Sequence, residues 1–120
     1  VTIAAWGLTF KANTDDLRDS PAIKILTMLH GAGAKIRAYD PTAKKAYAAY
    51  PWIEVVPSAL EACEGAEVLA VLTEWSEFAE VNPADVRNSL KSSKVVDGRN
   101  VLNRDVWRSA GFSYRGVGRS

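Results

Sequence analysis

The chain has 120 residues, of which 48% are hydrophobic, so it can build one packed core and is too short for two independent ones. Its 15 Lys and Arg and 14 Asp and Glu leave a net charge of +1, which provides no electrostatic basis for binding nucleic acid or an acidic membrane. A single cysteine, Cys63, excludes an internal disulfide and a cysteine-rich metal cluster, and suits a cytoplasmic protein. Because Val1 leads straight into a strand without an initiator Met, we expect one domain, residues 1–120, that is a piece of a longer polypeptide.

Short apolar or alternating runs recur along the chain and predict six strands, at residues 2–6, 35–39, 53–56, 68–72, 94–97 and 113–117. The fourth run, Val68 to Leu72, is apolar at every position, as expected of a central parallel strand covered on both faces. It is also far too short to span a membrane.

The intervening segments predict helices at residues 21–30, 42–50, 58–65, 82–91 and 103–110. The first has the best-marked start, with Ser20 as N-cap and Pro21 in the first turn. Its apolar stripe should lie on the sheet and consists of Ala22, Ile23, Ile25, Leu26 and Leu29. Strands that alternate with helices predict right-handed βαβ units, and therefore a three-layer α/β/α fold with a Rossmann-like, doubly wound, mainly parallel sheet of five to six strands.

A parallel sheet gathers the loops that follow its strands on one edge, where such folds bind their ligands. Two basic residues, Lys11 and Arg99, fall in these loops and could clamp a diphosphate, the arginine as a bidentate fork and the lysine as a point charge. Spacing alone leaves open a purely structural alternative, in which they pair with Asp15, Asp16 or Asp97.

The chain lacks the Gly-x-Gly-x-x-Gly turn of a dinucleotide site after its first strand, because residues 31–33 end a helix instead of opening one. Asp40 stands where a ribose-binding acid would lie, but without the glycines we favour a turn-capping role before Pro41. Cys63 lies between acidic neighbours and is interpreted as a buried filler, and His30, without a catalytic partner, as a helix-end residue.

The four tryptophans fall into two groups. We expect Trp6, Trp52 and Trp107 to pack, whereas Trp75 lies in a loop at the ligand edge and could be a packing residue or a wall of the site. A phosphoacceptor receiver domain is excluded, since the third strand ends without an Asp and Lys94 precedes its strand instead of following it.

Residues 7–21, GLTFKANTDDLRDSP, closely resemble the opening of the C-terminal, UDP-binding domain of the UDP-glucose/GDP-mannose dehydrogenase family. The resemblance continues in order through residues 39–41 (YDP), 72–78 (LTEWSEF) and 96–100 (VDGRN), and so covers essentially the whole chain. It implies an NAD-dependent enzyme that oxidises the C6 alcohol of a nucleotide sugar with two NAD⁺, through an aldehyde and a cysteine thioester, to a uronic acid used in polysaccharide biosynthesis. In this family an N-terminal domain binds NAD and a central helical region carries the catalytic cysteine, and neither is represented here.

Carried over by position, the resemblance implies that Phe10 and Lys11 contact the nucleotide sugar and that Arg99 binds the UDP moiety. It implies that Arg18 reaches the NAD diphosphate from across the cleft. No catalytic residue and no metal ligand is expected in this chain, and Asp15 and Asp16 are expected to hold the loop and its basic residues in position.

Residues 72–75 (LTEW) look most like the UDP-glucose branch, so we favour oxidation of UDP-glucose to UDP-glucuronate. The alternatives are the same domain of a GDP-mannose or UDP-N-acetylmannosamine dehydrogenase, or a stand-alone nucleotide-binding module without catalysis. The resemblance also implies that the full-length protein is a homo-oligomer and that the isolated chain is inactive.

Overall fold

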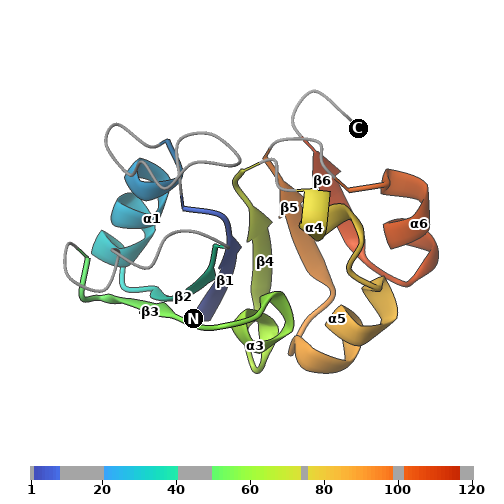
Figure 1. Ribbon diagram of the computed structural model, residues 1–120, viewed down its shortest axis with the longest axis horizontal. Helices are drawn as coiled ribbons and strands as arrows, with labels where there is room; N and C mark the ends of the chain where they lie inside the picture. Colours follow the sequence, from blue (N-terminus) through green and yellow to red (C-terminus); the bar gives the residue numbers. More distant parts are fainter. Residues whose placement is uncertain (1, 9–20, 41–49, 74–75, 99–101, 117–120) are drawn as a thin grey trace.

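The computed structural model describes residues 2–8, 21–40, 50–73, 76–98 and 102–116. In these ranges six parallel strands form one sheet in the order β3-β2-β1-β4-β5-β6 (Figure 1). The strands are β1 (Thr2–Trp6), β2 (Lys35–Tyr39), β3 (Ile53–Val55), β4 (Val68–Val71), β5 (Lys94–Asp97) and β6 (Ser113–Gly116). Strand order reverses between the neighbours β1 and β4, so the predicted doubly wound parallel sheet is confirmed.

The described helices are α1 (Pro21–Gly31), α3 (Ala59–Cys63), α4 (Ser76–Ala79), α5 (Pro83–Ser89) and α6 (Arg104–Ser109). Three of them begin at a capping side chain that accepts a hydrogen bond from a backbone N–H of the first turn, and these caps are Ser58, Asn82 and Asn103. The helix predicted at residues 42–50 lies almost entirely outside the described residues.

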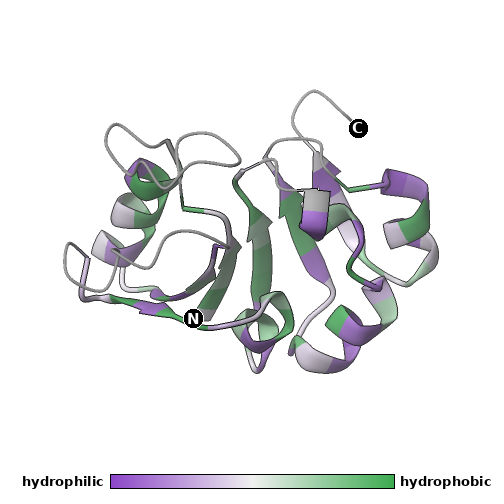
Figure 2. Ribbon diagram, viewed as in Figure 1, coloured by the Kyte–Doolittle hydropathy of each residue, from purple (hydrophilic) through white to green (hydrophobic). Residues whose placement is uncertain are grey.

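The helices lie on both faces of the sheet and bury two separate apolar clusters (Figure 1). On one face, α1 packs Ile23 and Leu26 against β1, β2 and β3. On the other, α3, α4, α5 and α6 cover a larger cluster that contains Trp6 and Trp107. The central strand β4 is hydrophobic along its length (Figure 2), and three of its four residues are buried, as its apolar run predicts.

Two details differ from the sequence-based expectations. Ile25 was expected on the sheet, but its side chain is 44% exposed, because the buried stripe of α1 is narrower and runs through Ala22, Ile23 and Leu26. The stretch after β4, expected to be a loop, contains the short helix α4. Phe78 fixes this helix by stacking on Trp6, with ring centroids 5.3 Å apart, a long-range contact that local sequence does not reveal.

Candidate functional site

The loop that follows β1 is anchored where the structure last describes it, at Gly7 and Leu8. The N–H of Gly7 donates to the carbonyl oxygen of Tyr39 at 2.8 Å, and the N–H of Leu8 donates to Oδ2 of Asp40 at 2.8 Å. Asp40 is only 6% exposed. The structure thus gives Asp40 a partner on the neighbouring loop that the sequence did not indicate, and the carboxylate ties the ends of β1 and β2 together.

A second contact joins β1 to β4, at the point where the strand order reverses. Gly7 has φ +105° and approaches Thr73 so closely that a Cβ atom on Gly7 would lie 1.9 Å from Oγ1 of Thr73. The Thr73 hydroxyl is buried and has no hydrogen-bond partner in the described part of the chain. Ligands of doubly wound folds bind at this reversal, so Gly7 and Thr73 form the floor of the candidate site.

The end of β5 is fixed in a comparable way. Asp97 is fully buried, and its Oδ2 accepts hydrogen bonds from the N–H of Leu102 at 2.7 Å and from the hydroxyl of Tyr114 at 2.9 Å. The N–H of Gly98 donates to the carbonyl oxygen of Val71 at 2.8 Å, which continues the pairing of β5 with β4 by one residue.

At the rim of the same edge, the hydroxyl of Tyr39 donates to Oε2 of Glu77 at 2.6 Å. Burial, and then the bond to Glu77, raise the pKa of Tyr39 above its ordinary value. The phenol is therefore a neutral donor at physiological pH and links the end of β2 to α4.

The residues predicted to bind ligand, Phe10, Lys11, Arg18 and Arg99, lie outside the described residues, and their roles remain predictions. Trp75 and the acidic pair at positions 15 and 16 lie outside them as well. The described part of the chain does place the strands that lead into these segments. β1 and β5 are both paired with β4, one on each side, so the segments after them start from the same edge of the sheet.

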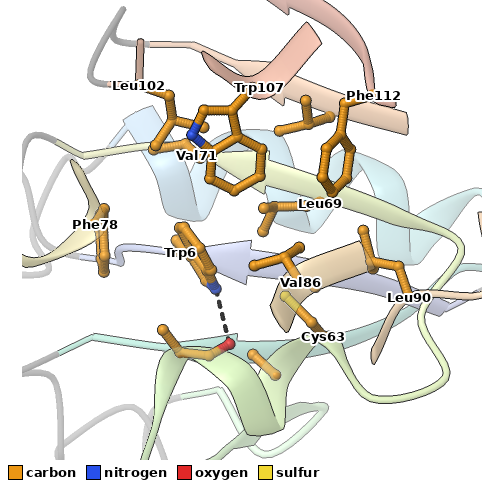
Figure 3. Close-up of a cluster of buried hydrophobic side chains, with 14 of the residues drawn as sticks. Trp6, Cys63, Leu69, Val71, Phe78, Val86, Leu90, Leu102, Trp107 and Phe112 are labelled. Carbon is orange, nitrogen blue, oxygen red and sulfur yellow. Dashed lines mark hydrogen bonds between the residues drawn. The ribbon is translucent and has the colours of Figure 1, made fainter. Parts of the chain in front are cut away.

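Cys63 is fully buried in the larger apolar cluster, beside Leu90 and Val86 in Figure 3, so the structure confirms that it is a core residue. Burial raises the pKa of its thiol to about 12. Trp6 and Trp107 are confirmed in the same core. His30 is exposed at the end of α1 and stacks on Trp52 with a centroid distance of 4.5 Å.

We therefore expect the Cys63 thiol of the native protein to react with a disulfide reagent at pH 8 about a thousandfold more slowly than the unfolded chain, because each unit of pKa removes tenfold of the thiolate. Since the folded pKa is raised from 9.0 to about 12, the stability linked to this proton is complete below pH 9 and is lost as the pH rises toward 12. Cys63→Ala should flatten the fall in unfolding free energy over that range. Rapid reaction of the native thiol would contradict the assignment.

The described residues do not form a dinucleotide cradle, since Thr73 fills the space beside Gly7 and the next side chain, Leu8, is buried. No group of three or more His, Cys, Asp or Glu side chains in the described ranges is placed to hold a metal ion. None of the described helices has the length and apolar character needed to cross a bilayer.

A family model described as "UDP-glucose/GDP-mannose dehydrogenase family, UDP binding domain" matches residues 4–104 of this chain. The chain therefore belongs to that family and corresponds to its UDP-binding domain, as its motifs indicated.

One curated relative and two solved structures match this chain over almost its whole length. UDP-glucose 6-dehydrogenase of Rickettsia prowazekii is 42% identical over 120 residues, which cover 97% of this chain and 27% of that protein. Two solved structures also match 99% of the chain, each at 26% identity. They are an NDP-N-acetyl-D-galactosaminuronic acid dehydrogenase from Methanosarcina mazei, with a TM-score of 0.85 over 25% of its chain, and a UDP-glucose dehydrogenase from Pyrobaculum islandicum, with 0.79 over 26%. The chain thus spans about a quarter of the length of the relatives that it matches.

Proposed function

We propose that this chain is the C-terminal, UDP-binding domain of an NAD-dependent UDP-glucose 6-dehydrogenase, and that it holds the UDP half of the substrate across the active-site cleft. The observation that carries the proposal is the placement of β1 and β5 on either side of β4, with all three strands ending at one edge. Neighbouring strands lie about 4.8 Å apart, so the segments after β1 and β5 start about 10 Å from each other. Side chains of lysine and arginine can converge on one diphosphate across such a gap.

In this proposal the chain binds and orients the substrate. Lys11 neutralises phosphate charge as a compact ammonium group, and Arg99 grips phosphate oxygens with its planar fork, which fixes the orientation of the diphosphate. Phe10 contacts the nucleotide sugar beside Lys11. Holding the diphosphate from one side places the sugar toward the remainder of the enzyme, where proximity and orientation lower the barrier to reaction.

NAD, in this proposal, is bound mainly by an N-terminal domain outside this chain, and when bound it accepts the hydride from the sugar alcohol. Arg18 is the one residue of this chain proposed to reach its diphosphate. The catalytic cysteine belongs to a central helical region that is also outside this chain. The full-length enzyme is proposed to be a cytoplasmic homo-oligomer.

UDP-glucose is the proposed substrate because the relative with 42% identity is named for it. The solved structures include dehydrogenases of other nucleotide sugars at lower identity, which supports the shared fold more than the choice of sugar. Competition calorimetry with UDP, GDP, UDP-glucose and UDP-N-acetylmannosamine would separate these branches. Tighter binding of GDP than of UDP would exclude the proposed substrate.

Arg99→Ala is expected to weaken UDP binding about tenfold to 150-fold, because a charge-assisted hydrogen bond contributes about 1.5–3 kcal/mol. Calorimetric titration with UDP measures the change. A matched control is Lys91→Ala, which removes one positive charge near the opposite edge, where the N–H of Lys91 pairs with Ala66 just before β4. Equal affinity of Arg99→Ala and the unaltered protein would show that Arg99 does not bind UDP.

Whether the protein is a complete enzyme is a separate question. Sequencing the gene upstream of Val1 should reveal a Gly-x-Gly-x-x-Gly strand-turn-helix and a catalytic cysteine motif within about 300 residues, the length of two domains. If both are missing, the chain is a stand-alone nucleotide-binding module.

A further inference from the structure

One face of the sheet is only half covered by the described helices. α1 packs on the face that carries Ile3, Ala5 and Ala38, and it lies over the half of the sheet formed by β1, β2 and β3 (Figure 1). The other four described helices pack on the opposite face, in the larger apolar cluster. Parallel sheets of this class are covered by helices on both faces. Among the described residues, the β4–β6 half of the face that carries α1 therefore lacks its outer layer.

The strand register identifies the side chains of this uncovered half. Ala5 pairs with Ala70, which pairs with Val96, and paired residues of neighbouring strands point to the same face. Val96 pairs in turn with Arg115 on β6. The exposed fraction rises along this row, from 0% at Ala5 and 9% at Ala70 to 44% at Val96, because the cover that α1 provides ends before β5. We call this surface the open half-face, and it consists of Val68, Ala70, Lys94, Val96, Ser113 and Arg115.

The open half-face has an apolar centre and a basic border. Val68, Ala70 and Val96 form the centre, and the exposed side chains of Lys94 and Arg115 border it. None of the ion pairs of the described residues includes either basic side chain, and none of the six residues is acidic. The distance from β4 to β6 is about 10 Å, at about 4.8 Å for each pair of neighbouring strands, and this is close to the diameter of one helix. The surface therefore matches one helix whose apolar stripe is bordered by Asp or Glu.

We propose that the open half-face binds a helix of the same polypeptide, outside residues 1–120, that has an apolar stripe bordered by acidic side chains. The inference rests on the proposed function to the extent that this chain is one domain of a longer enzyme. The chain covers only 27% of the Rickettsia prowazekii relative, so most of such a polypeptide lies outside this domain. A tethered helix is present at an effective concentration of about millimolar, so even a small surface binds it.

A second copy of this chain fits the open half-face less well. A two-fold dimer places the same surface of each copy against the other. Lys94 and Arg115 of the two copies would then meet like charges, without a carboxylate from the open half-face to neutralise them, which disfavours association. Because an acidic helix supplies the missing charges, charge complementarity favours it over a second copy.

Two cysteine variants of the full-length protein test whether this surface is covered. Val96 is 44% exposed, and Val106, on α6 at the opposite face, is 50% exposed, so cysteines at the two positions are similarly accessible in this domain. In the full-length protein we expect Val96→Cys to react with a thiol reagent about tenfold or more slowly than Val106→Cys, because the bound helix must move away before the reagent can enter. Mass spectrometry of the labelled peptides separates both positions from Cys63, which is buried.

The protection of Val96→Cys should depend on the basic border. Lys94→Glu combined with Arg115→Glu should repel the acidic helix and bring the labelling rate to within about threefold of that of the exposed control. Lys35→Glu should leave the protection unchanged. It is the matched control because Lys35 is exposed and begins a strand, as Lys94 does, but the register places it on the opposite face.

Cross-linking identifies the occupant. A carbodiimide joins an amine to a carboxylate in contact with it, so it should link Lys94 to an Asp or Glu outside residues 1–120 of the same molecule. Mixing isotope-labelled and unlabelled protein distinguishes links within one molecule from links between two.

The outcomes separate this inference from the proposed function. Equal labelling of Val96→Cys and Val106→Cys would show that the open half-face is bare, and links between two molecules would show that a second copy covers it. Protection that survives both charge reversals would show that the occupant is not acidic. Each of these results overturns the inference, whether or not UDP binds. If calorimetry detects no UDP binding while Val96→Cys is protected, the proposed function fails and the covered surface remains.

Discussion

Gly7→Ala is expected to lower the free energy of unfolding by about 2–5 kcal/mol, from left-handed backbone strain of about 1–2 kcal/mol and overpacking of about 1–3 kcal/mol. Gly7 has φ +105°, a conformation that residues with a Cβ atom rarely adopt. The new methyl group would lie 1.9 Å from Oγ1, 2.8 Å from Cβ and 2.9 Å from the backbone nitrogen of Thr73. Because the obstacle includes backbone, a change of side-chain rotamer cannot remove it.

Two other glycines provide matched controls for this substitution. Gly33 has φ +101° with nothing within 4 Å of a Cβ atom, so Gly33→Ala should show the backbone strain alone. Gly31, at the end of α1, has neither the positive φ nor a close neighbour, and Gly31→Ala should change stability by less than about 1 kcal/mol. Urea denaturation of the three variants measures the series. Equal stability of Gly7→Ala and Gly33→Ala would show that the contact with Thr73 is not tight.

The same contact affects the candidate site, because Gly7 precedes Leu8 and the predicted binding loop. If Thr73 is displaced, the ends of β1 and β4 separate at the point where the strand order reverses. UDP affinity of Gly7→Ala, measured below its unfolding transition, should therefore fall more than that of Gly33→Ala. When Thr73→Ala is added to Gly7→Ala, it should restore only part of the unfolding free energy that Gly7→Ala removes. The Cβ and backbone nitrogen of residue 73 would still lie too close to the new methyl group.

Much of the fold could be predicted because the relevant signals are local. The strand bounds at residues 35–39 and 94–97 were predicted correctly, since β-branched or alternating runs are bounded by turn residues there. The helices predicted to start at residues 82 and 103 do start there, and the structure shows Asn82 and Asn103 to be their N-caps. Errors appeared where a distant contact decides the structure. Phe78 anchors α4 through Trp6, and Ile25 points away from a sheet that its spacing suggested it would cover.

The candidate site could likewise be predicted where local motifs are informative and not where distant segments meet. The motif identified the family and predicted that Lys11 and Arg99 bind the nucleotide sugar, and these roles remain predictions. It did not reveal that Asp40 binds the N–H of Leu8, or that Asp97 joins Tyr114 to the backbone of Leu102. The bonds between Asp40 and Leu8 and between Asp97 and Tyr114 link segments that only the folded sheet brings together, so neither follows from spacing along the chain.

Trp6→Ala is expected to lower the free energy of unfolding by about 3–5 kcal/mol, the range for removing a large buried aromatic side chain. Trp6 is 0% exposed and connects three elements. It stacks on Phe78 of α4, meets Trp107 of α6 edge to face at 6.2 Å, and donates its indole N–H to the carbonyl oxygen of Ala59 at 2.9 Å, the dashed line in Figure 3. Its loss would leave a cavity beneath the end of β1 and remove the hydrogen bond to the carbonyl oxygen of Ala59 on α3.

Trp6→Phe separates the packing of the ring from the indole hydrogen bond, because it keeps an aromatic ring and removes the hydrogen bond. It should lower the free energy of unfolding by about 1–3 kcal/mol. The matched control is Trp52→Ala, whose ring is only half-buried beside His30 and Tyr50 and should cost less than Trp6→Ala. Urea denaturation followed by far-UV circular dichroism compares the variants.

Because Trp6 is the last residue of β1 and Phe78 belongs to the helix that follows β4, Trp6→Ala should also weaken UDP binding at temperatures where the variant is still folded. Equal losses of stability for Trp6→Ala and Trp52→Ala would show that the cluster at the end of β1 does not anchor the site.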